Sequence, residues 1–196
     1  MLSYDESLKI LKDTNALLEG HFILSSGLHS KQYIQCAKLL SNPKAAETIF
    51  SSLVEKINSK FKNIDIILAP ALGGIVVGYE IGKQLNCQTI FAERENNKLT
   101  LRRGFAIPKN SNVLIVEDVI TTGKSALECS EIVKNNNSNL IGYACILDRS
   151  DDRLLIKDTI ISQVKFKIKL FKKSELPDHL KKITPIKPGS KSLSNE

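Results

Sequence analysis

Short apolar runs alternate along the chain with stretches in which apolar residues recur every three or four positions. Residues 113–116 form an uninterrupted run rich in β-branched side chains, which is typical of a buried strand, and residues 126–133 carry apolar positions at helical spacing. The same two patterns recur on both sides of this pair, so the sequence predicts an α/β fold. Further strands are expected over residues 64–69, 89–93 and 141–147, and further helices over residues 42–57 and 75–85.

The two ends of the chain carry patterns of their own. A capping box that begins at Ser3 predicts a first helix, which Gly20 would end. Residues 21–24 and 33–36 predict two short strands on either side of a polar turn. Near the other end, residues 163–171 alternate apolar side chains with lysines, and this alternation predicts a one-sided strand at the edge of a sheet.

The length and charge of the chain limit its organisation and its partners. With 196 residues, it fits one α/β domain with a small addition. The net charge of +7 favours an anionic substrate or a nucleic acid. The lysines, however, are spread along the chain with little aromatic interleaving, which is more typical of a solvated surface than of a nucleic-acid interface. We therefore expect no nucleic-acid partner.

The cysteines and histidines indicate neither disulfides nor a metal centre. The cysteines stand far apart without a C-x-x-C pair, and the histidines have no metal-ligand spacing, so we expect buried thiols in a reducing compartment. The N-terminus lacks the basic-then-apolar order of a signal peptide, and no apolar run approaches the length of a membrane span. We therefore expect a cytoplasmic protein without membrane contact. The residues concerned are Cys36, Cys87, Cys129, Cys145, His21, His29 and His179.

The most informative stretch joins the predicted strand and helix around residues 113–133. Glu117 and Asp118 follow the apolar run, so they would point into the crevice where open parallel sheets bind ligands. Residues 121–125, with the sequence T-T-G-K-S, open the predicted helix and would supply free backbone N–H groups, hydroxyls and the positive end of a helix dipole. Two acids beside such a phosphate cradle suit a phosphorylated sugar, whose hydroxyls would bind the carboxylates.

Two other interpretations of this stretch fit less well. The tail G-K-S resembles the end of a Walker A loop, but that motif needs a glycine five positions before Gly123, where Asp118 stands. A carboxylate at that position would repel a triphosphate, so we reject this interpretation. The other is an ordinary turn in which Thr122 or Ser125 caps the helix, but such a cap needs neither two adjacent acids nor the T-T-G-K-S run.

The thirteen residues 113–125, V-L-I-V-E-D-V-I-T-T-G-K-S, resemble the 5-phosphoribosyl 1-diphosphate (PRPP) signature of the type I phosphoribosyltransferases. The resemblance implies a twisted, mainly parallel sheet flanked by helices, with a small hood over the active site. It also implies that Glu117 and Asp118 hold the ribose hydroxyls, that Mg²⁺ binds nearby through PRPP without a certain protein ligand, and that residues 121–125 hold the 5-phosphate. The PRPP-binding residues implied in this way are Glu117, Asp118, Val119, Ile120, Thr121, Thr122, Gly123, Lys124 and Ser125.

A glycine pair after the predicted strand 64–69 fits the same family. Leu72, Gly73 and Gly74 belong to the sequence P-A-L-G-G. By spacing alone, a tight turn between strand and helix explains this sequence as well as a ligand contact does, because glycine serves both. The resemblance implies that this loop contacts the pyrophosphate of PRPP through backbone amides. Some orotate-using relatives have a lysine at the position of Gly73, so a positive charge would be absent here.

Residues 94–103 form a polar, basic stretch that composition alone would describe as a solvated hairpin. They resemble the mobile loop that closes over PRPP and, in dimeric relatives, reaches the active site of the neighbouring subunit. The resemblance therefore implies a homodimer, with Arg94 and Lys98 as candidate pyrophosphate contacts. The returning strand would begin at Arg102, Arg103 and Gly104.

Residues 24–33, with the pattern L-x-S-G-x-x-S-x-x-Y, are similar to the N-terminal segment of one branch of the family, the orotate phosphoribosyltransferases. In that branch the segment lies against the orotate ring. The resemblance makes Ser26, Gly27 and Tyr33 candidate residues of the orotate site. Many relatives have a lysine where this chain has Ser25, so a PRPP contact would be absent or supplied by another residue.

Arg149 follows the predicted strand 141–147 and has two interpretations. An arginine on an exposed turn is usually a surface residue, or here a partner for Asp148, Asp151 or Asp152. Orotate phosphoribosyltransferases have an arginine just after this strand that binds the carboxylate side of the substrate, a group that guanidinium recognises through paired hydrogen bonds. The resemblance implies this second role for Arg149, together with Thr121.

The resemblance implies an enzyme that transfers the phosphoribosyl group from PRPP to orotate, giving orotidine 5-monophosphate and pyrophosphate in pyrimidine (UMP) biosynthesis. The expected organisation is a single domain over residues 1–196, with a hood from about residues 1–40 plus the C-terminal segment and a flexible loop at about residues 94–103. Two alternatives stay open. One is a type I phosphoribosyltransferase that uses a purine or uracil, and the other is a regulator that keeps the PRPP fold and binds RNA.

Overall fold

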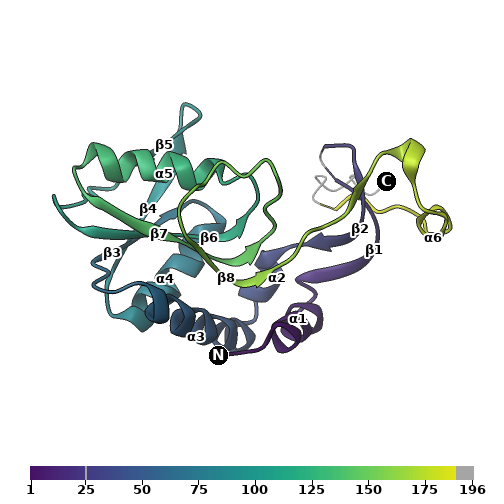
Figure 1. Cartoon of the computed structure of the whole chain (residues 1–196), viewed down its shortest axis with the longest axis horizontal. Helices are drawn as coiled ribbons and strands as arrows, with labels where there is room; N and C mark the ends of the chain where they lie inside the picture. Colours follow the sequence, from purple (N-terminus) through teal and green to yellow (C-terminus); the bar gives the residue numbers. More distant parts are fainter. Residues whose placement is uncertain (25, 189–196) are drawn as a thin grey trace, which may run out of the picture.

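A six-stranded sheet lies at the centre of the computed structural model, which describes residues 1–24 and 26–188 (Figure 1). Its strands run in the order β5-β4-β3-β6-β7-β8. Neighbouring strands are parallel except β4 and β5, which are antiparallel, so the predicted α/β fold and mainly parallel sheet are confirmed. The strands are β3 (Ile66–Pro70), β4 (Gln88–Glu95), β5 (Lys98–Leu101), β6 (Asn112–Ile120), β7 (Asn139–Asp148) and β8 (Ile160–Lys165).

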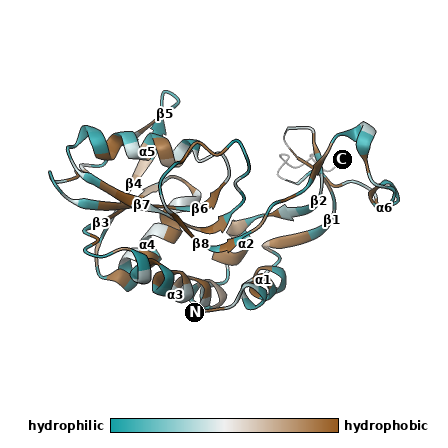
Figure 2. Cartoon of the chain, viewed as in Figure 1, coloured by the Kyte–Doolittle hydropathy of each residue, from teal (hydrophilic) through white to brown (hydrophobic). Residues whose placement is uncertain are grey.

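Helices cover both faces of this sheet (Figure 1). In β6, Leu114 and Val116 join the core beneath α3 and α4, whereas Val113 and Ile115 join the core beneath α5, because successive side chains of a strand point to opposite faces. Both faces are therefore buried, and the central strands are correspondingly apolar (Figure 2). The three helices are α3 (Pro43–Lys60), α4 (Gly73–Leu85) and α5 (Lys124–Asn135).

A smaller antiparallel sheet of β1, β2 and β9 forms a hood beside the main sheet (Figure 1). The end of the described chain joins this hood, since the Ile23 N–H donates to the Ile186 carbonyl and the Ile186 N–H donates to the His21 carbonyl, both at 2.8 Å. The small hood and its C-terminal contribution were both predicted. Its elements are β1 (Leu17–Ile23), β2 (His29–Ile34), β9 (Leu170–Phe171), the 3₁₀ helix η1 (Lys173–Glu175) and α6 (Asp178–Lys181).

The first two helices pack on the main sheet and its helices. α1 (Tyr4–Asp13) contacts β8, the hood strand β1 and α3, and its buried Ser7 Oγ accepts a 2.8 Å hydrogen bond from Gln163 Nε2 of β8. α2 (Cys36–Leu40) contacts α3 and α4. The hood sheet takes residues 17–34 from the N-terminal part of the chain, within the expected range of about 1–40.

The boundaries near the N-terminus differ from the prediction. The capping box at Ser3 is confirmed, but α1 ends at Asp13 rather than at Gly20. The reason is Asn15, which adopts a left-handed conformation with φ of 56° and stops the helix before β1 begins. Gly20 lies inside β1, and Cys36 begins α2 instead of ending a strand.

The basic stretch 94–103 is a β-hairpin in the structure rather than an open loop. β4 continues to Glu95 and pairs with β5 across a two-residue turn. Asn96 and Asn97 have φ values of 48° and 64°, the left-handed conformation that such a tight hairpin turn requires. The strand that was expected to begin at Arg102 is β5, and it has already ended at Leu101.

The alternating stretch 163–171 is divided between two sheets. Its first part ends β8, which is an edge strand of the main sheet as predicted, and its last part is β9 of the hood. The prediction of a single strand across the whole stretch is therefore wrong. The reason is that residues 166–169 carry the chain from one sheet to the other.

The cysteines of the structure are free thiols. All four cysteines are free; Cys36, Cys129 and Cys145 are buried and Cys87 is half-buried. The part of the chain that the structure describes contains no group of three or more metal-binding side chains. Within the same residues, no helix has the length and apolarity needed to cross a membrane.

Candidate active site

Strand β6 carries the two acids of the central motif, and it is longer than predicted. It pairs with β7 as far as Ile120, so Glu117 and Asp118 lie within the strand instead of after it. Consecutive strand residues point to opposite faces. Asp118 accordingly lies against the start of α4, whereas Glu117 lies on the α5 side, close to Cys129. The expectation that both carboxylates follow the strand is wrong, because strand pairing continues past the apolar run.

The closest approach in the site is between Asp118 and the first residue of α4. A Cβ atom on Gly73 would lie only 2.4 Å from Asp118 Oδ2, so only glycine fits here without displacing the carboxylate. The peptide bond between Ala71 and Leu72 is cis, and no side chain of the described residues caps the start of α4. Because α4 begins at Gly73, the N–H groups at the positive end of this helix lie beside the Asp118 carboxylate. A lysine at position 73 would not be compatible with this arrangement.

Burial weakens the charge of the acidic pair. Burial, with a further contribution from Asp118, raises the pKa of Glu117 to about 8, so this carboxyl is mostly protonated at neutral pH and can donate a hydrogen bond. Burial also raises the pKa of Asp118, although the Val119 N–H opposes this by donating a 2.9 Å hydrogen bond to Asp118 Oδ1. The pair therefore repels a phosphorylated ligand less than two free carboxylates would.

The turn between β6 and α5 ends in an uncapped helix start. Gly123 is the N-cap residue, with φ of +75°, and no side chain within the described residues caps the helix. The interpretation in which Thr122 or Ser125 serves as an ordinary cap is therefore wrong. The first N–H groups of α5 lack partners within the helix, as is general for a helix start, and no side chain of the described residues takes their place.

A second loop, residues 151–158, supports this turn. The Leu155 N–H donates to the Thr122 carbonyl at 3.0 Å. Ile156 is buried, and a Cβ atom on Gly123 would lie 2.6 Å from its Cδ1 atom. The sequence reasoning missed these residues, although three consecutive apolar side chains at 154–156 in a polar stretch were an available signal.

Arg149 lies at the carboxyl end of β7, and its backbone N–H donates to the Ile120 carbonyl at 2.8 Å. Its Nε atom is buried without a hydrogen-bond partner among the described residues. Burial lowers the pKa of Arg149, while Cys36 and Tyr33 lie near enough to oppose the shift. The neighbouring acids are engaged elsewhere: Asp148 Oδ2 with Lys165 Nζ at 2.9 Å and Asp151 Oδ2 with Arg153 Nη2 at 2.6 Å.

A small cavity of about 120 Å³ brings Arg149 and Thr121 together. These two residues were predicted to act on the same ligand, and they come from the ends of adjacent strands. Three of the lining residues are positively charged, whereas one is an acid, so the cavity favours an anionic group. Its lining consists of Thr121, Arg149, Asp151, Arg153, Lys167, Ile168 and Leu170.

The predicted site residues of the hood lie in two separate places, Tyr33 on a strand and Ser26 with Gly27 in a turn. Tyr33, on β2, lies near Arg149 and packs against Phe22 with ring centroids 5.7 Å apart. Ser26 and Gly27 belong to the turn between β1 and β2, where the Gly27 N–H donates to the Leu24 carbonyl at 2.9 Å. Their hydrogen bonds in the described chain stay within that turn. Ser25 lies outside the described residues.

The arginines of the β4–β5 hairpin are paired with acids. Arg94 Nη1 lies 3.1 Å from Glu128 Oε2 on α5, and Arg103 makes two 2.8 Å hydrogen bonds to Glu93. Lys98 is exposed, with no ion pair among the described residues. Arg94 would have to leave Glu128 before it could contact a pyrophosphate, so its predicted role requires the hairpin to rearrange.

Comparison with known proteins agrees with this geometry. Residues 36–175 match the family described as "Phosphoribosyl transferase domain". An orotate phosphoribosyltransferase of Caldicellulosiruptor bescii is 45% identical over 190 residues, covering 97% of this chain and 99% of that protein. One of Methylorubrum populi is 43% identical over 190 residues, covering 96% and 97%.

The fold is shared with solved structures at lower identity. The orotate phosphoribosyltransferase of Aeropyrum pernix superimposes with a TM-score of 0.70 at 23% identity, covering 81% of this chain and 92% of that one. Leishmania donovani UMP synthase gives a TM-score of 0.69 at 20% identity, covering 84% of this chain and 37% of that one. Since the family match spans more than half of the chain and both sequence relatives match it along nearly their whole length, the chain belongs to the phosphoribosyltransferase family and, within it, to the orotate phosphoribosyltransferases.

Proposed function

We propose that the chain transfers the 5-phosphoribosyl group from PRPP to orotate, giving orotidine 5-monophosphate and pyrophosphate in pyrimidine biosynthesis. The observation that carries this proposal is the buried, unpartnered Nε atom of Arg149 beside Thr121. A buried N–H group without a partner is costly, and a carboxylate on a planar ring would satisfy it. Asp118 and the uncapped start of α5 lie on the adjacent strand and its following turn, where the sugar phosphate would bind.

The reaction is displacement at the anomeric carbon of ribose, so the chain contributes alignment and charge rather than a nucleophile. The N–H groups at the start of α5 would hold the 5-phosphate, and Asp118 with Glu117 would hold the ribose hydroxyls. The N–H groups at the start of α4, next to Gly73, would bind the pyrophosphate that departs. Arg149 and Thr121 would orient the attacking ring, with Tyr33 of the hood limiting the access of water.

The residues present fit a magnesium ion that arrives with PRPP. Mg²⁺ prefers oxygen ligands and is often bound through substrate phosphates with few protein ligands. Asp118 supplies carboxylate oxygens beside the start of α4, where the pyrophosphate would bind, and the described residues contain no group of three metal-binding side chains that would hold the ion by themselves. When bound, the ion would neutralise part of the charge on the pyrophosphate.

We further propose a homodimer in the cytoplasm. Four unpaired thiols are typical of a reducing compartment. In the dimer, the β4–β5 hairpin with Arg94 and Lys98 would act on the pyrophosphate after the ion pair of Arg94 with Glu128 opens.

The activity is tested by following the loss of orotate absorbance with PRPP and Mg²⁺ present. We expect turnover that stops on chelation of the metal and resumes when Mg²⁺ is added in excess. Adenine, hypoxanthine and uracil serve as matched bases, and we expect them to be left unused because none carries a carboxylate for Arg149. A folded protein that leaves orotate untouched, or that prefers one of the other bases, would overturn the proposal.

Replacing Arg149 tests the orotate site. In Arg149→Met, the transition-state binding of orotate should weaken by roughly 2 to 5 kcal/mol, a fall of roughly thirtyfold to several thousandfold in kcat/KM, because a buried charge pair is lost. The KM for PRPP should change little. Lys134→Met is the control, since that ammonium group pairs with Glu131 on α5 and does not line the cavity. An equal fall in kcat/KM for orotate and for PRPP, or an equal fall in both variants, would contradict the role of Arg149 in binding orotate.

Replacing Gly73 tests the contact with Asp118. In Gly73→Ala, the new methyl group and the Asp118 carboxylate cannot both keep their places. The kcat/KM for PRPP should therefore fall at least tenfold, which corresponds to a loss of about 1.4 kcal/mol in transition-state binding. Thermal unfolding should show that the variant stays folded. Gly20→Ala is the control, because a Cβ atom there meets only ordinary contacts with Phe22. Unchanged PRPP kinetics in Gly73→Ala would show that the close approach has no role in binding.

A further inference from the structure

The chain crosses from the main sheet to the hood between β8 and β9 (Figure 1). β8 ends at Lys165, and β9 begins only at Leu170. β9 pairs with the first two residues of β2, whereas β2 continues to Ile34. Residues 166–169, which we call the crossing segment, therefore belong to neither sheet, and the later part of β2 is not covered by β9.

A cavity of about 550 Å³ lies between the crossing segment and β2. Its volume falls within the range of small-molecule sites, roughly 300 to 1,000 Å³. Residues of α1 and α6 contribute the rest of its walls. We call it the hood cavity, and its lining consists of Tyr4, Lys31, Gln32, Phe166, Lys167, Lys169, Phe171, Pro177 and His179.

The lining of the hood cavity carries positive charge and includes no acid. Lys31 comes from β2, and Lys167 and Lys169 come from the crossing segment. None of these three lysines forms an ion pair within the part of the chain that the structure describes. His179 adds a ring nitrogen on the same cavity. The lining therefore attracts an anion.

The acids near these lysines already have other partners. Glu19, near Lys31, lies 3.0 Å from the ammonium group of a lysine on α1. Asp151, near Lys167, lies 2.6 Å from a guanidinium nitrogen of Arg153. The lysines of the hood cavity therefore lack a counter-charge of their own, and an anionic ligand from solution would supply it.

Three aromatic side chains share the hood cavity with the lysines. Phe166 and Phe171 are half-buried, and Tyr4 is 49% exposed. Lys169 Nζ lies 5.5 Å from the centroid of the Phe171 ring, so a charge and an aromatic ring border the same space. Aromatic side chains stack on planar rings of many kinds. The lining thus suits a ligand that combines a planar ring with several negative charges.

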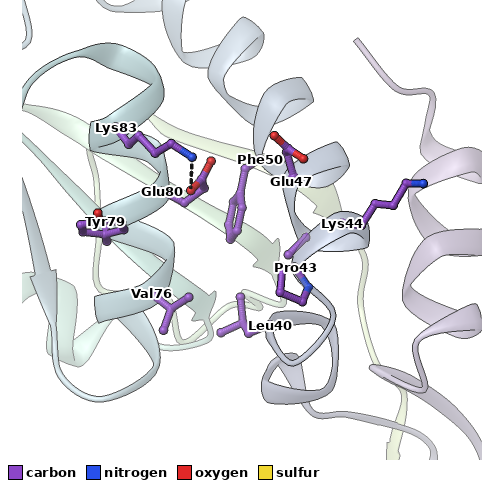
Figure 3. A pocket seen from close by; sticks show the side chains of 10 residues that line it. Leu40, Pro43, Lys44, Glu47, Phe50, Val76, Tyr79, Glu80 and Lys83 are labelled. Atoms are coloured by element: carbon purple, nitrogen blue, oxygen red, sulfur yellow. Dashed lines mark hydrogen bonds and ion pairs between the residues drawn. The ribbon is translucent and has the colours of Figure 1, made fainter.

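The groove between α3 and α4 lacks this combination (Figure 3). It has a volume of about 370 Å³, and its lining carries two lysines and two glutamates. Figure 3 shows Lys83 joined to Glu80, whose Nζ and Oε2 atoms lie 3.4 Å apart. Equal numbers of acids and bases give an anion no net attraction there. The hood cavity differs from this groove in the sign of its charge.

We infer that the hood cavity binds a nucleoside phosphate at a site separate from the one where PRPP and orotate would bind. The phosphates would lie on the ammonium groups of Lys31 and Lys169, and the base would stack against Phe166 or Phe171. Both groups of the ligand are needed to use the whole lining. PRPP has phosphates without a planar ring, and orotate has a planar ring without a phosphate, so neither matches the hood cavity as well.

The crossing segment connects the hood cavity to the candidate active site. Ile168 and Leu170 line the cavity of Arg149, and Lys167 lines both cavities. A phosphate in the hood cavity would attract the Lys167 ammonium group and draw positive charge away from the place where we put orotate. This consequence rests on the proposed function. Bound nucleotide should weaken the binding of orotate, and orotate should weaken the binding of nucleotide by the same factor.

Calorimetric titration of the full chain with adenosine triphosphate (ATP) tests the site. We expect one ATP to bind per chain, about tenfold or more tightly than inorganic tripolyphosphate, which has the charge without the ring. PRPP should displace ATP no better than tripolyphosphate does. The inference is overturned if no saturable binding is seen, if tripolyphosphate binds as well as ATP, or if an equivalent of PRPP displaces the nucleotide.

Two variants place the bound ATP. Lys169→Met and Lys31→Met remove one charge from each side of the hood cavity, and each should weaken ATP binding by about fivefold or more. Lys172→Met is the matched control, since its ammonium group lies 3.8 Å from Glu175 and does not line the cavity. Thermal unfolding should show that all three variants stay folded. Unchanged affinity in either cavity variant, or an equal loss in Lys172→Met, would place the nucleotide elsewhere.

Orotate kinetics test the link through the crossing segment, with Mg²⁺ in excess over ATP. Bound ATP should raise the KM for orotate, and in Lys169→Met the same rise should require about fivefold more ATP, while the KM without ATP stays at the parent value. A KM that does not respond to bound ATP would overturn the link. A chain that binds ATP as expected but leaves orotate untouched would overturn the proposed function alone, so the two failures are distinguishable.

Discussion

The close approach of the Asp118 carboxylate to the start of α4 is the constraint on which the site depends. β6 occupies the middle of the sheet between β3 and β7, and α4 follows β3 directly. The parallel pairing of β3 and β6 places the turn after one strand against the carboxyl end of the other. Only a residue without a side chain can occupy position 73 while Asp118 stays where it is. Gly73 and Asp118 are thus one feature, contributed by the turn after β3 and by the neighbouring strand β6.

The same edge of the sheet collects the remaining parts of the site. β6 and β7 end side by side, so Thr121 and Arg149 meet over one cavity, and the hood brings Tyr33 toward Arg149. Open parallel sheets bind ligands at this edge because several turns and helix starts converge there. The raised pKa values of Glu117 and Asp118 fit a ligand that carries several negative charges. A phosphorylated, pyrophosphate-bearing sugar and an anionic base would meet between two helix starts and one guanidinium.

Much of the central sheet and of the candidate site could be predicted from the sequence, because neighbouring residues along the chain specify these parts. A β-branched run, two acids and T-T-G-K-S specify a strand, a turn and a helix without help from distant residues. What the sequence did not indicate depends on pairing between elements. The length of β6 follows from its ladder with β7, and that ladder turns Glu117 and Asp118 to opposite faces. The support of Gly123 by Ile156 and the division of residues 163–171 between two sheets are likewise tertiary. The hairpin at residues 94–103 agrees with the composition of that stretch, and its turn at Asn96 and Asn97 is a local signal, whereas the mobile loop was implied by the family resemblance.

A crystal structure with the sugar bound tests the central claim most directly. Crystals soaked in PRPP with Mg²⁺ should show the 5-phosphate on the N–H groups at the start of α5 and a ribose hydroxyl within hydrogen-bond distance of Asp118. The pyrophosphate should lie at the turn that begins α4. The sugar bound elsewhere, with the space beside Asp118 and Gly73 empty, would contradict the account.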